Sequence, residues 1–215
     1  MRSLLLPLLL LGATQAADPT KPHIHQGRLA SYDGPPPTVE LTADELAALA
    51  RDEVVKRQLK TGDGGRAVAV QDIHASPEII WDRILDYPAY PEMVDNVHEI
   101  EIYERSGDRL KVRFVIGALL MSMEYYIEHV VRTDEGWETW TLDYSRESDL
   151  DDSVGFWRVE ALPERPGYSR VFYSVEVFPR GWIPGPIEDF VTDRGLTKAT
   201  DWVKRESEAK AGTGR

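Results

Sequence analysis

The sequence predicts an α+β fold: a seven-stranded antiparallel sheet, two short helices after its first strand and a long C-terminal helix. Three observations predict it. A strand-like segment is followed by a helical segment that prolines break, and alternation of apolar and polar residues then recurs through six further segments. An apolar stripe repeating every four residues comes last. Few folds have their elements in this order, so the order strongly limits the folds that the chain can adopt.

The helical segment after the first strand contains the most informative stretch of the chain, residues 81–97. Ser76 stands at an N-cap position and Pro77 at the first helical position, which is typical of a helix start. Pro88 and Pro91 fix their own φ angles and disfavour the α conformation of the residues before them. We therefore expect a helix, a kink and a second short helix, which together support the last helix.

The strand segments assign an inward and an outward face to the sheet, because side chains alternate along a strand. Ser106-Gly107-Asp108 and Asp134-Glu135-Gly136 have the composition of tight turns between strands. The pattern is typical of an antiparallel meander with one buried and one solvated face. The predicted strands are 66–74, 97–104, 109–117, 122–132, 137–144, 153–161 and 168–178.

The last helix is predicted to begin at Pro186. Gly195 within it costs roughly 1 kcal/mol of helix stability relative to alanine, which indicates close packing or room for a guest molecule. The apolar stripe consists of Ile187, Val191, Gly195, Ala199 and Trp202 or Val203.

Residues 1–16 have the pattern of a secretory signal peptide. Arg2 supplies the positive charge, residues 4–11 form the apolar segment, and small residues up to Ala16 form the cleavage site. The segment is too short for a membrane-spanning anchor. We expect cleavage after Ala16 and a periplasmic or secreted location.

The next segments precede the main domain. Residues 17–40 are rich in proline and predict an extended spacer without a packed core. Within 41–61, Thr42 and Glu45 form a capping box that predicts an amphipathic helix from Ala43 to Leu59. The main domain is expected at 66–208, followed by a disordered tail at 209–215.

Composition excludes several classes of function. The chain has 25 Lys and Arg against 37 Asp and Glu, a net charge of −12, which disfavours binding to nucleic acid. It has no cysteine, so catalytic thiols and thiolate metal sites are excluded. No phosphate-binding loop, serine triad or histidine–carboxylate metal cluster is evident, and we expect neither cofactor nor metal.

The ordered motifs resemble the START-like (SRPBCC) superfamily with its helix-grip fold, and most closely its polyketide cyclase/dehydrase and coenzyme Q-binding group. The resemblance covers residues 66–208 and rests on the strand 66–74, the stretches 75–81 and 85–93, Ser153-Val154-Gly155-Phe156-Trp157 and the last helix. It implies a curved sheet wrapped around that helix, with an apolar cavity that commonly holds a lipid, isoprenoid, sterol or polyketide. It supplies no catalytic constellation that could be carried over.

The first hypothesis is an exported protein that binds or carries such a hydrophobic molecule without catalysis. The alternative is a cyclase or dehydratase that uses His129 and a cavity tyrosine, and a third is an interaction module whose cavity is filled by its own side chains. The candidate cavity residues are Phe114, Ile116, Met123, Tyr125, Ile127, His129, Trp140, Leu142, Trp157, Tyr173, Val175, Ile187, Val191 and Trp202.

Other residues have less specific interpretations. His129 is predicted inward, where a core histidine bonded to a neighbouring tyrosine is favoured over a ligand-orienting or general-base histidine. His23 and His25 are expected to be solvated, as is the acidic loop around 143–152. The apolar segments 119–121 and 182–183 are equally suited to a rim that contacts a membrane transiently and to a buried connection.

Overall fold

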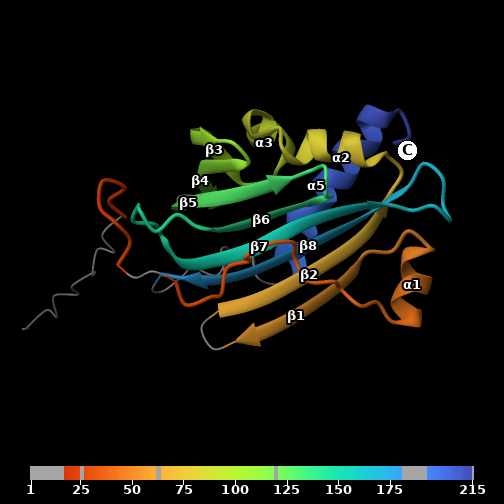
Figure 1. The fold of residues 1–215 in the computed structure, drawn as a ribbon, viewed down its shortest axis with the longest axis horizontal. Helices are drawn as coiled ribbons and strands as arrows, with labels where there is room; N and C mark the ends of the chain where they lie inside the picture. Colours follow the sequence, from red (N-terminus) through yellow and green to blue (C-terminus); the bar gives the residue numbers. More distant parts are fainter. Residues whose placement is uncertain (1–16, 25–26, 62–63, 119–120, 181–192, 215) are drawn as a thin grey trace, which may run out of the picture.

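The computed structural model describes residues 17–24, 27–61, 64–118, 121–180 and 193–214. An eight-stranded antiparallel sheet, curved but not closed, forms its centre (Figure 1), with the strand order β1-β2-β8-β7-β6-β5-β4-β3. The predicted fold class is confirmed, with one strand more than expected. The strands are β1 (Val55–Thr61), β2 (Gly64–Ile73), β3 (Val97–Ser106), β4 (Arg109–Ala118), β5 (Met121–Arg132), β6 (Trp137–Leu142), β7 (Leu150–Ala161) and β8 (Ser169–Pro179).

Helices lie against both faces of the sheet (Figure 1). The face that packs against the C-terminal helix is called the inner face here, and the broken helix also lies on it. A smaller helix packs on the outer face, where Leu49 contacts a second apolar cluster that includes Phe156 and Phe172. Within the described ranges the helices are α1 (Ala43–Leu49), α2 (Pro77–Ile84), the 3-10 helix η1 (Tyr87–Ala89), α3 (Tyr90–Met93) and α5 (Asp193–Ala211).

The proline-broken helix has the predicted form. Pro77 occupies the first turn of α2, and the chain kinks before η1 and α3, as the proline constraints require. Ser76 is the N-cap residue of α2, although its side chain makes no capping hydrogen bond. Arg205 of α5 donates to the carbonyl oxygen of Met93 at 2.6 Å, which joins this support to the last helix.

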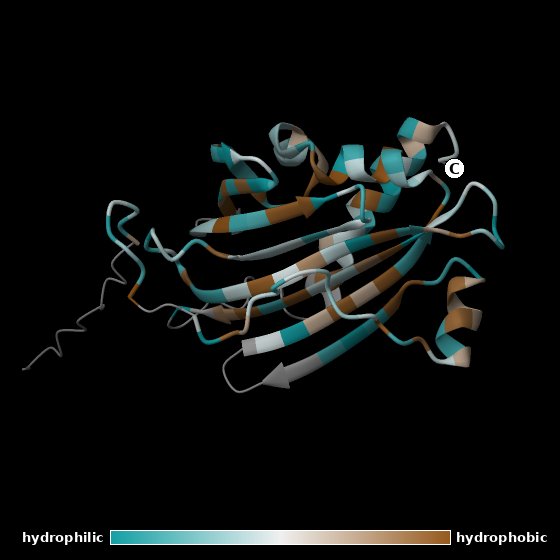
Figure 2. Cartoon of the chain, viewed as in Figure 1, coloured by the Kyte–Doolittle hydropathy of each residue, from teal (hydrophilic) through white to brown (hydrophobic). Residues whose placement is uncertain are grey.

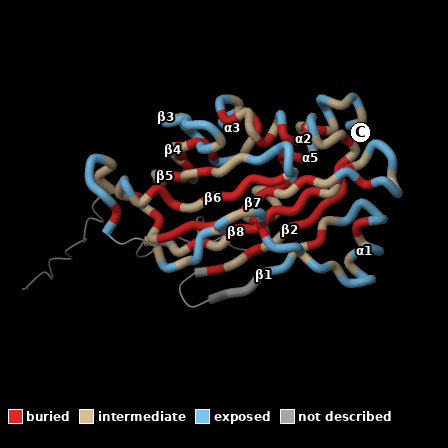
Figure 3. Tube along the Cα trace, in the orientation of Figure 1, coloured by how far each residue is buried: buried red, intermediate tan, exposed pale blue. Residues whose placement is uncertain are grey.

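The predicted strand faces agree with the burial of side chains. Figure 2 shows apolar and polar residues alternating along the strands, and Figure 3 shows that buried residues concentrate in the sheet interior. In β4, Leu110, Val112, Phe114 and Ile116 all join the inner core. In β2, Ala69 joins the inner core, whereas Val70 joins the outer cluster beneath α1, so the outer face is less solvated there than predicted.

The predicted helix from Ala43 to Leu59 is wrong in its second half. The capping box of Thr42 and Glu45 is present, but α1 ends at Leu49. Asp52 then takes a positive φ of 62°, and Val55 begins strand β1 at the edge of the sheet. Antiparallel pairing of β1 with β2 satisfies its backbone groups and overrides the weak helical pattern of this segment.

The segment 17–40 is not an unpacked spacer in its described parts, because it lies against the acidic loop after β6. His23 is only 7% exposed, so the expectation that it is solvated is wrong. Its backbone N–H donates to the carbonyl oxygen of Tyr144 at 3.0 Å, and its Nε2 lies 3.1 Å from the carbonyl oxygen of Asp151. His25 lies outside the described residues.

The acidic loop is buried at two of its carboxylates, contrary to the prediction of a solvated loop. Asp143 is 3% and Asp152 is 0% exposed. Asp152 accepts hydrogen bonds from the backbone N–H of Leu29 at 2.8 Å and from the hydroxyl of Tyr144 at 2.5 Å. Asp152 therefore holds the N-terminal segment on the sheet, whereas Asp143 accepts from the hydroxyl of Tyr103 on β3.

The predicted disordered tail at 209–215 is also wrong for its described part. Helix α5 continues to Ala211, and the hydroxyl of Thr213 donates to the carbonyl oxygen of His74 at 2.5 Å. Lys210 pairs with Asp82 of α2. These contacts fix the end of α5 against α2 and the segment that precedes it.

The last helix closes the inner face over the described part of its length. Leu196, Trp202 and Val203 are buried in the inner core, and Gln71 of β2 donates to the carbonyl oxygen of Thr200 at 2.9 Å. The predicted helix start at Pro186 and the rim segments 119–120 and 182–183 lie outside the described residues. Among those that are described, no helix is long and apolar enough to cross a membrane.

Gly155 permits close packing between β7 and β6. It pairs with Trp140 in the ladder, and a Cβ atom at this position would overlap the Trp140 ring and the backbone oxygen of Ser174. We predict that Gly155→Ala lowers the free energy of unfolding by about 3 kcal/mol, because neither neighbour can move without disturbing the sheet. Chemical denaturation measures this loss.

Gly34 provides the matched control for this substitution, since nothing lies within 4 Å of a Cβ atom placed there. Gly34→Ala should change the free energy of unfolding by no more than about 0.5 kcal/mol. Equal effects of the two substitutions would show that the close approach at Gly155 does not matter.

Candidate functional site

The inner face forms a continuous apolar and aromatic wall. Every predicted cavity residue in the described part of the chain lies on this wall, and all but Tyr125 are buried. Ile187 and Val191, the other two predicted residues, lie outside the described residues. The residues brought together are Phe114, Ile116, Met123, Tyr125, Ile127, His129, Trp140, Leu142, Trp157, Tyr173, Val175 and Trp202.

Aromatic rings run across the wall from the sheet to α5. Phe114 and Tyr125 stack with ring centres 5.2 Å apart. The ring centres of Tyr173 and Trp157 lie 4.5 Å apart. Trp157 packs edge-on against Trp202 of α5, with ring centres 6.5 Å apart. Burial raises the pKa of Tyr125 and of Tyr173 well above the usual value, so both hydroxyls stay protonated.

A small polar cluster lies within this apolar wall, formed by Tyr87, His129 and Glu138. Nδ1 of His129 lies 2.6 Å from Oε1 of Glu138, and the hydroxyl of Tyr87 donates to the same oxygen at 2.7 Å. His129 is 6% and Glu138 is 0% exposed. Burial raises the pKa of Tyr87 far above its usual value and the neighbouring Glu138 raises it further, so Tyr87 is a hydrogen-bond donor.

Three elements position this cluster. His129 of β5 pairs with Trp140 of β6, and Glu138 lies two residues before Trp140, on the same inner face. The broken helix places Tyr87 over them, because the kink at Asp86 and Pro88 aims η1 at the sheet. The hydroxyl of Tyr87 also lies 3.3 Å from Nδ1 of His129, as expected for a core histidine beside a tyrosine.

Sequence reasoning missed Glu138 and Tyr87 as members of the site. Strand alternation already placed Glu138 on the face of Trp140 and Leu142, so an acidic residue at an inward position was a detectable signal. Tyr87 carried no such signal, since its role depends on the direction of the helix after the kink. The broken helix therefore contributes to the polar cluster as well as supporting α5.

Two polar atoms of the cluster have no hydrogen-bond partner within the described part of the chain. They are Nε2 of His129 and Oε2 of Glu138, and both are buried. An unpaired buried polar group costs about 1–3 kcal/mol. Other buried side-chain atoms in the described part of the chain also lack a hydrogen-bond partner, but these two lie side by side within the aromatic wall, where they leave one hydrogen-bonding position on each residue open.

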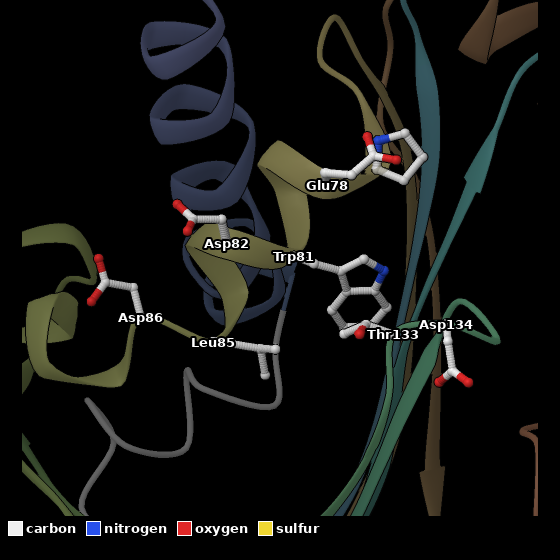
Figure 4. A pocket seen from close by; sticks show the side chains of 8 residues that line it. Glu78, Trp81, Asp82, Leu85, Asp86, Thr133 and Asp134 are labelled. Carbon is white, nitrogen blue, oxygen red and sulfur yellow. The ribbon is translucent and has the colours of Figure 1, made fainter. Parts of the chain in front are cut away.

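A surface pocket of about 720 Å³ lies elsewhere, between α2 and the turn from β5 to β6 (Figure 4). It contains none of the predicted cavity residues. Its rim carries the carboxylates of Glu78, Asp82, Asp86 and Asp134 around the ring of Trp81. Such a rim is unsuited to an apolar ligand, because the ligand would compete with solvated charges.

Comparison with protein families supplies independent information on this architecture. A family model described as polyketide cyclase / dehydrase and lipid transport matches residues 73–201, more than half of the chain. The chain belongs to this family. The matched range includes the broken helix and all three residues of the polar cluster, and it ends within α5. A comparison with curated proteins gave no match.

Solved structures share the fold of this family member at low sequence identity. A protein from Thermus thermophilus is 18% identical, with a TM-score of 0.57 over 68% of this chain and 99% of its own. The Zhui aromatase/cyclase from Streptomyces sp. R1128 is 13% identical, with a TM-score of 0.57 over 75% and 100%. A STAR-related lipid transfer protein from Xanthomonas axonopodis is 12% identical, with a TM-score of 0.55 over 72% and 92%.

The site of this polyketide cyclase / dehydrase family member offers two kinds of chemistry. The aromatic wall can bury an apolar body, and the polar cluster can bind one oxygen-containing group or transfer a proton. No group of histidine and carboxylate side chains that could hold a metal ion occurs among the described residues.

Proposed function

We propose that the protein binds and carries a hydrophobic small molecule between the inner face of the sheet and helix α5, without catalysis. The observation that carries the proposal is the aromatic wall with a buried, incompletely paired polar cluster inside it. The family to which the chain belongs is described by lipid transport as well as by cyclase and dehydrase activity. A lipid, an isoprenoid or quinone, or a polyketide-like molecule fits such a wall.

Desolvation would supply most of the binding free energy. A ligand that buries about 500 Å² of apolar surface gains roughly 12 kcal/mol at about 25 cal/mol per Å². Association costs at least about 4 kcal/mol, which leaves at most roughly 8 kcal/mol, the equivalent of a micromolar Kd. Apolar contact would therefore supply the affinity, and the polar cluster would serve selectivity.

Acid–base catalysis is the second candidate function, and one observation favours it. Glu138 holds Nδ1 of His129, which is the arrangement that orients a histidine for proton transfer at Nε2. A cyclase or dehydratase would use Nε2 to move a proton of the substrate, with Tyr87 or a wall tyrosine as the hydroxyl donor. Turnover of a poly-β-keto substrate that is equal in wild type and His129→Ala would remove this candidate.

Binding is tested by native mass spectrometry of the protein, purified without detergent and exposed to a membrane lipid extract. We expect a bound apolar molecule in the wild type. Tyr125→Gln should reduce its occupancy at least fivefold, because the substitution removes a ring from the wall.

Tyr103→Gln is the matched control for that measurement. Tyr103 is a partly buried tyrosine on the outer face, where it donates to Asp143 at 2.6 Å. This variant should keep full occupancy. A wild-type protein that emerges empty and takes up nothing from the extract would contradict the binding function and favour an interaction module with a filled interior.

Export to the periplasm or the exterior, with cleavage after Ala16, is part of the same proposal, as is transient contact with a membrane that supplies the ligand. Two neighbouring contacts support the cleavage position. The backbone nitrogen of Ala17 lies 3.4 Å from Oδ1 of Asp149, and that of Asp18 lies 2.8 Å from Oε2 of Glu147. A new α-ammonium group at Ala17 would thus meet the carboxylate of Asp149.

Intact-mass measurement of protein recovered from the periplasm or the medium tests export and cleavage. The expected mass is that of a chain beginning at Ala17. Replacing Asp149 by asparagine should then destabilise this cleaved chain more than an uncleaved one, since only the former carries the ammonium group. A full-length mass in the cytoplasmic fraction alone would contradict export.

A further inference from the structure

We infer that the polar cluster of Tyr87, His129 and Glu138 selects ligands that carry an uncharged oxygen acceptor, a carbonyl group above all. The inference rests on the proposed binding function and names the chemistry that the site recognises. It starts from the two buried atoms without partners in the described structure, Nε2 of His129 and Oε2 of Glu138.

Proton positions follow from the geometry of the pair. A carboxylate that is 0% exposed is costly without a compensating positive charge or a proton. The pair is electrically neutral when one proton lies between Oε1 of Glu138 and Nδ1 of His129 and a second lies on Nε2. In this neutral arrangement Nε2 carries a hydrogen, wherever the shared proton resides along the 2.6 Å contact.

Contacts at Nδ1, the nitrogen opposite Nε2, hold the imidazole of His129 in its orientation. Glu138 binds Nδ1, and Tyr87 donates to the same carboxylate oxygen at 2.7 Å, so the ring cannot turn without breaking the contact. Aromatic rings flank the imidazole, since the ring centres of Phe114 and Trp140 lie 6.3 and 6.1 Å from that of His129, which is 6% exposed. The Nε2–H group is therefore a fixed donor in apolar surroundings, which is worth more than a donor in water.

The charge of the cluster decides which ligand group fits this donor. A carboxylate would bring a second negative charge close to Glu138, and a cation would meet the positive end of the Nε2–H bond. A carbonyl oxygen accepts the hydrogen bond without adding charge. A hydroxyl group could accept in the same way, and the unpaired Oε2 of Glu138 could take its proton in a second hydrogen bond.

Three probes with the same chain test the inference: undecyl methyl ketone, its isostere with a methylidene group in place of the carbonyl oxygen, and laurate. We expect the wild-type protein to bind the ketone roughly tenfold more tightly than the isostere, the factor for one satisfied buried donor. It should also bind the ketone more tightly than laurate. Isothermal titration or native mass spectrometry gives the affinities.

The variant His129→Leu/Glu138→Leu removes the donor and the carboxylate together, which avoids leaving a buried charge unpaired. It should bind the ketone and the isostere with equal affinity and still bind both. The control His98→Leu removes an exposed histidine on β3 and should keep the tenfold preference.

The outcomes separate the two proposals. If the wild type binds none of the probes, the hydrophobic-binding function and the inference both fail. If it binds ketone and isostere equally, prefers laurate, or keeps its preference in the double variant, the inference fails and the binding function stands.

A measurement on the wild type alone keeps the inference testable if the double variant does not fold. Long-range ¹H–¹⁵N spectra report the protonation of each imidazole nitrogen. Nε2 of His129 should carry a proton in the free protein, and its signal should shift on addition of the ketone but not of the isostere. A bare Nε2, or identical shifts with both probes, would overturn the inference.

Discussion

The buried hydrogen bond between His129 and Glu138 is the constraint on which the rest of the site depends. A carboxylate inside an aromatic wall survives only if it is paired and hydrogen bonded, so strands β5 and β6 must hold the two residues in register. The broken helix then adds Tyr87 as a second donor. The sheet, the broken helix and α5 thus enclose one polar cluster within an apolar interior.

Helix α5 and the kinked segment act as one cover over this interior. Tyr90 packs its ring against Trp202 at 4.9 Å, and its hydroxyl donates to the carbonyl oxygen of Ile84 at the end of α2. On the opposite face, α1 and the N-terminal segment cover strands that would otherwise be exposed. The inner face is therefore covered by α5 and the broken helix, while the outer face is covered by α1 and the N-terminal segment.

Strand alternation was sufficient to predict the inner face, since the inward residues of β4, β5 and β8 follow from their spacing alone. The proline pair predicted the break in the helix, but not that η1 would aim Tyr87 at Glu138, because that direction is set by tertiary packing. Strand β1 was mistaken for helix, since its only strong signal is its pairing with β2. Burial of Asp152 and His23 was missed because a distant segment supplies the partners.

The central claim is that the His129–Glu138 pair is present for a ligand and not for the stability of the fold. The free energy of unfolding of wild type, His129→Leu and His129→Leu/Glu138→Leu tests it most directly. We predict a loss of about 3–5 kcal/mol in the single variant, which leaves a carboxylate buried alone, and stability at or above the wild-type value in the double variant. A double variant as unstable as the single one would contradict the claim.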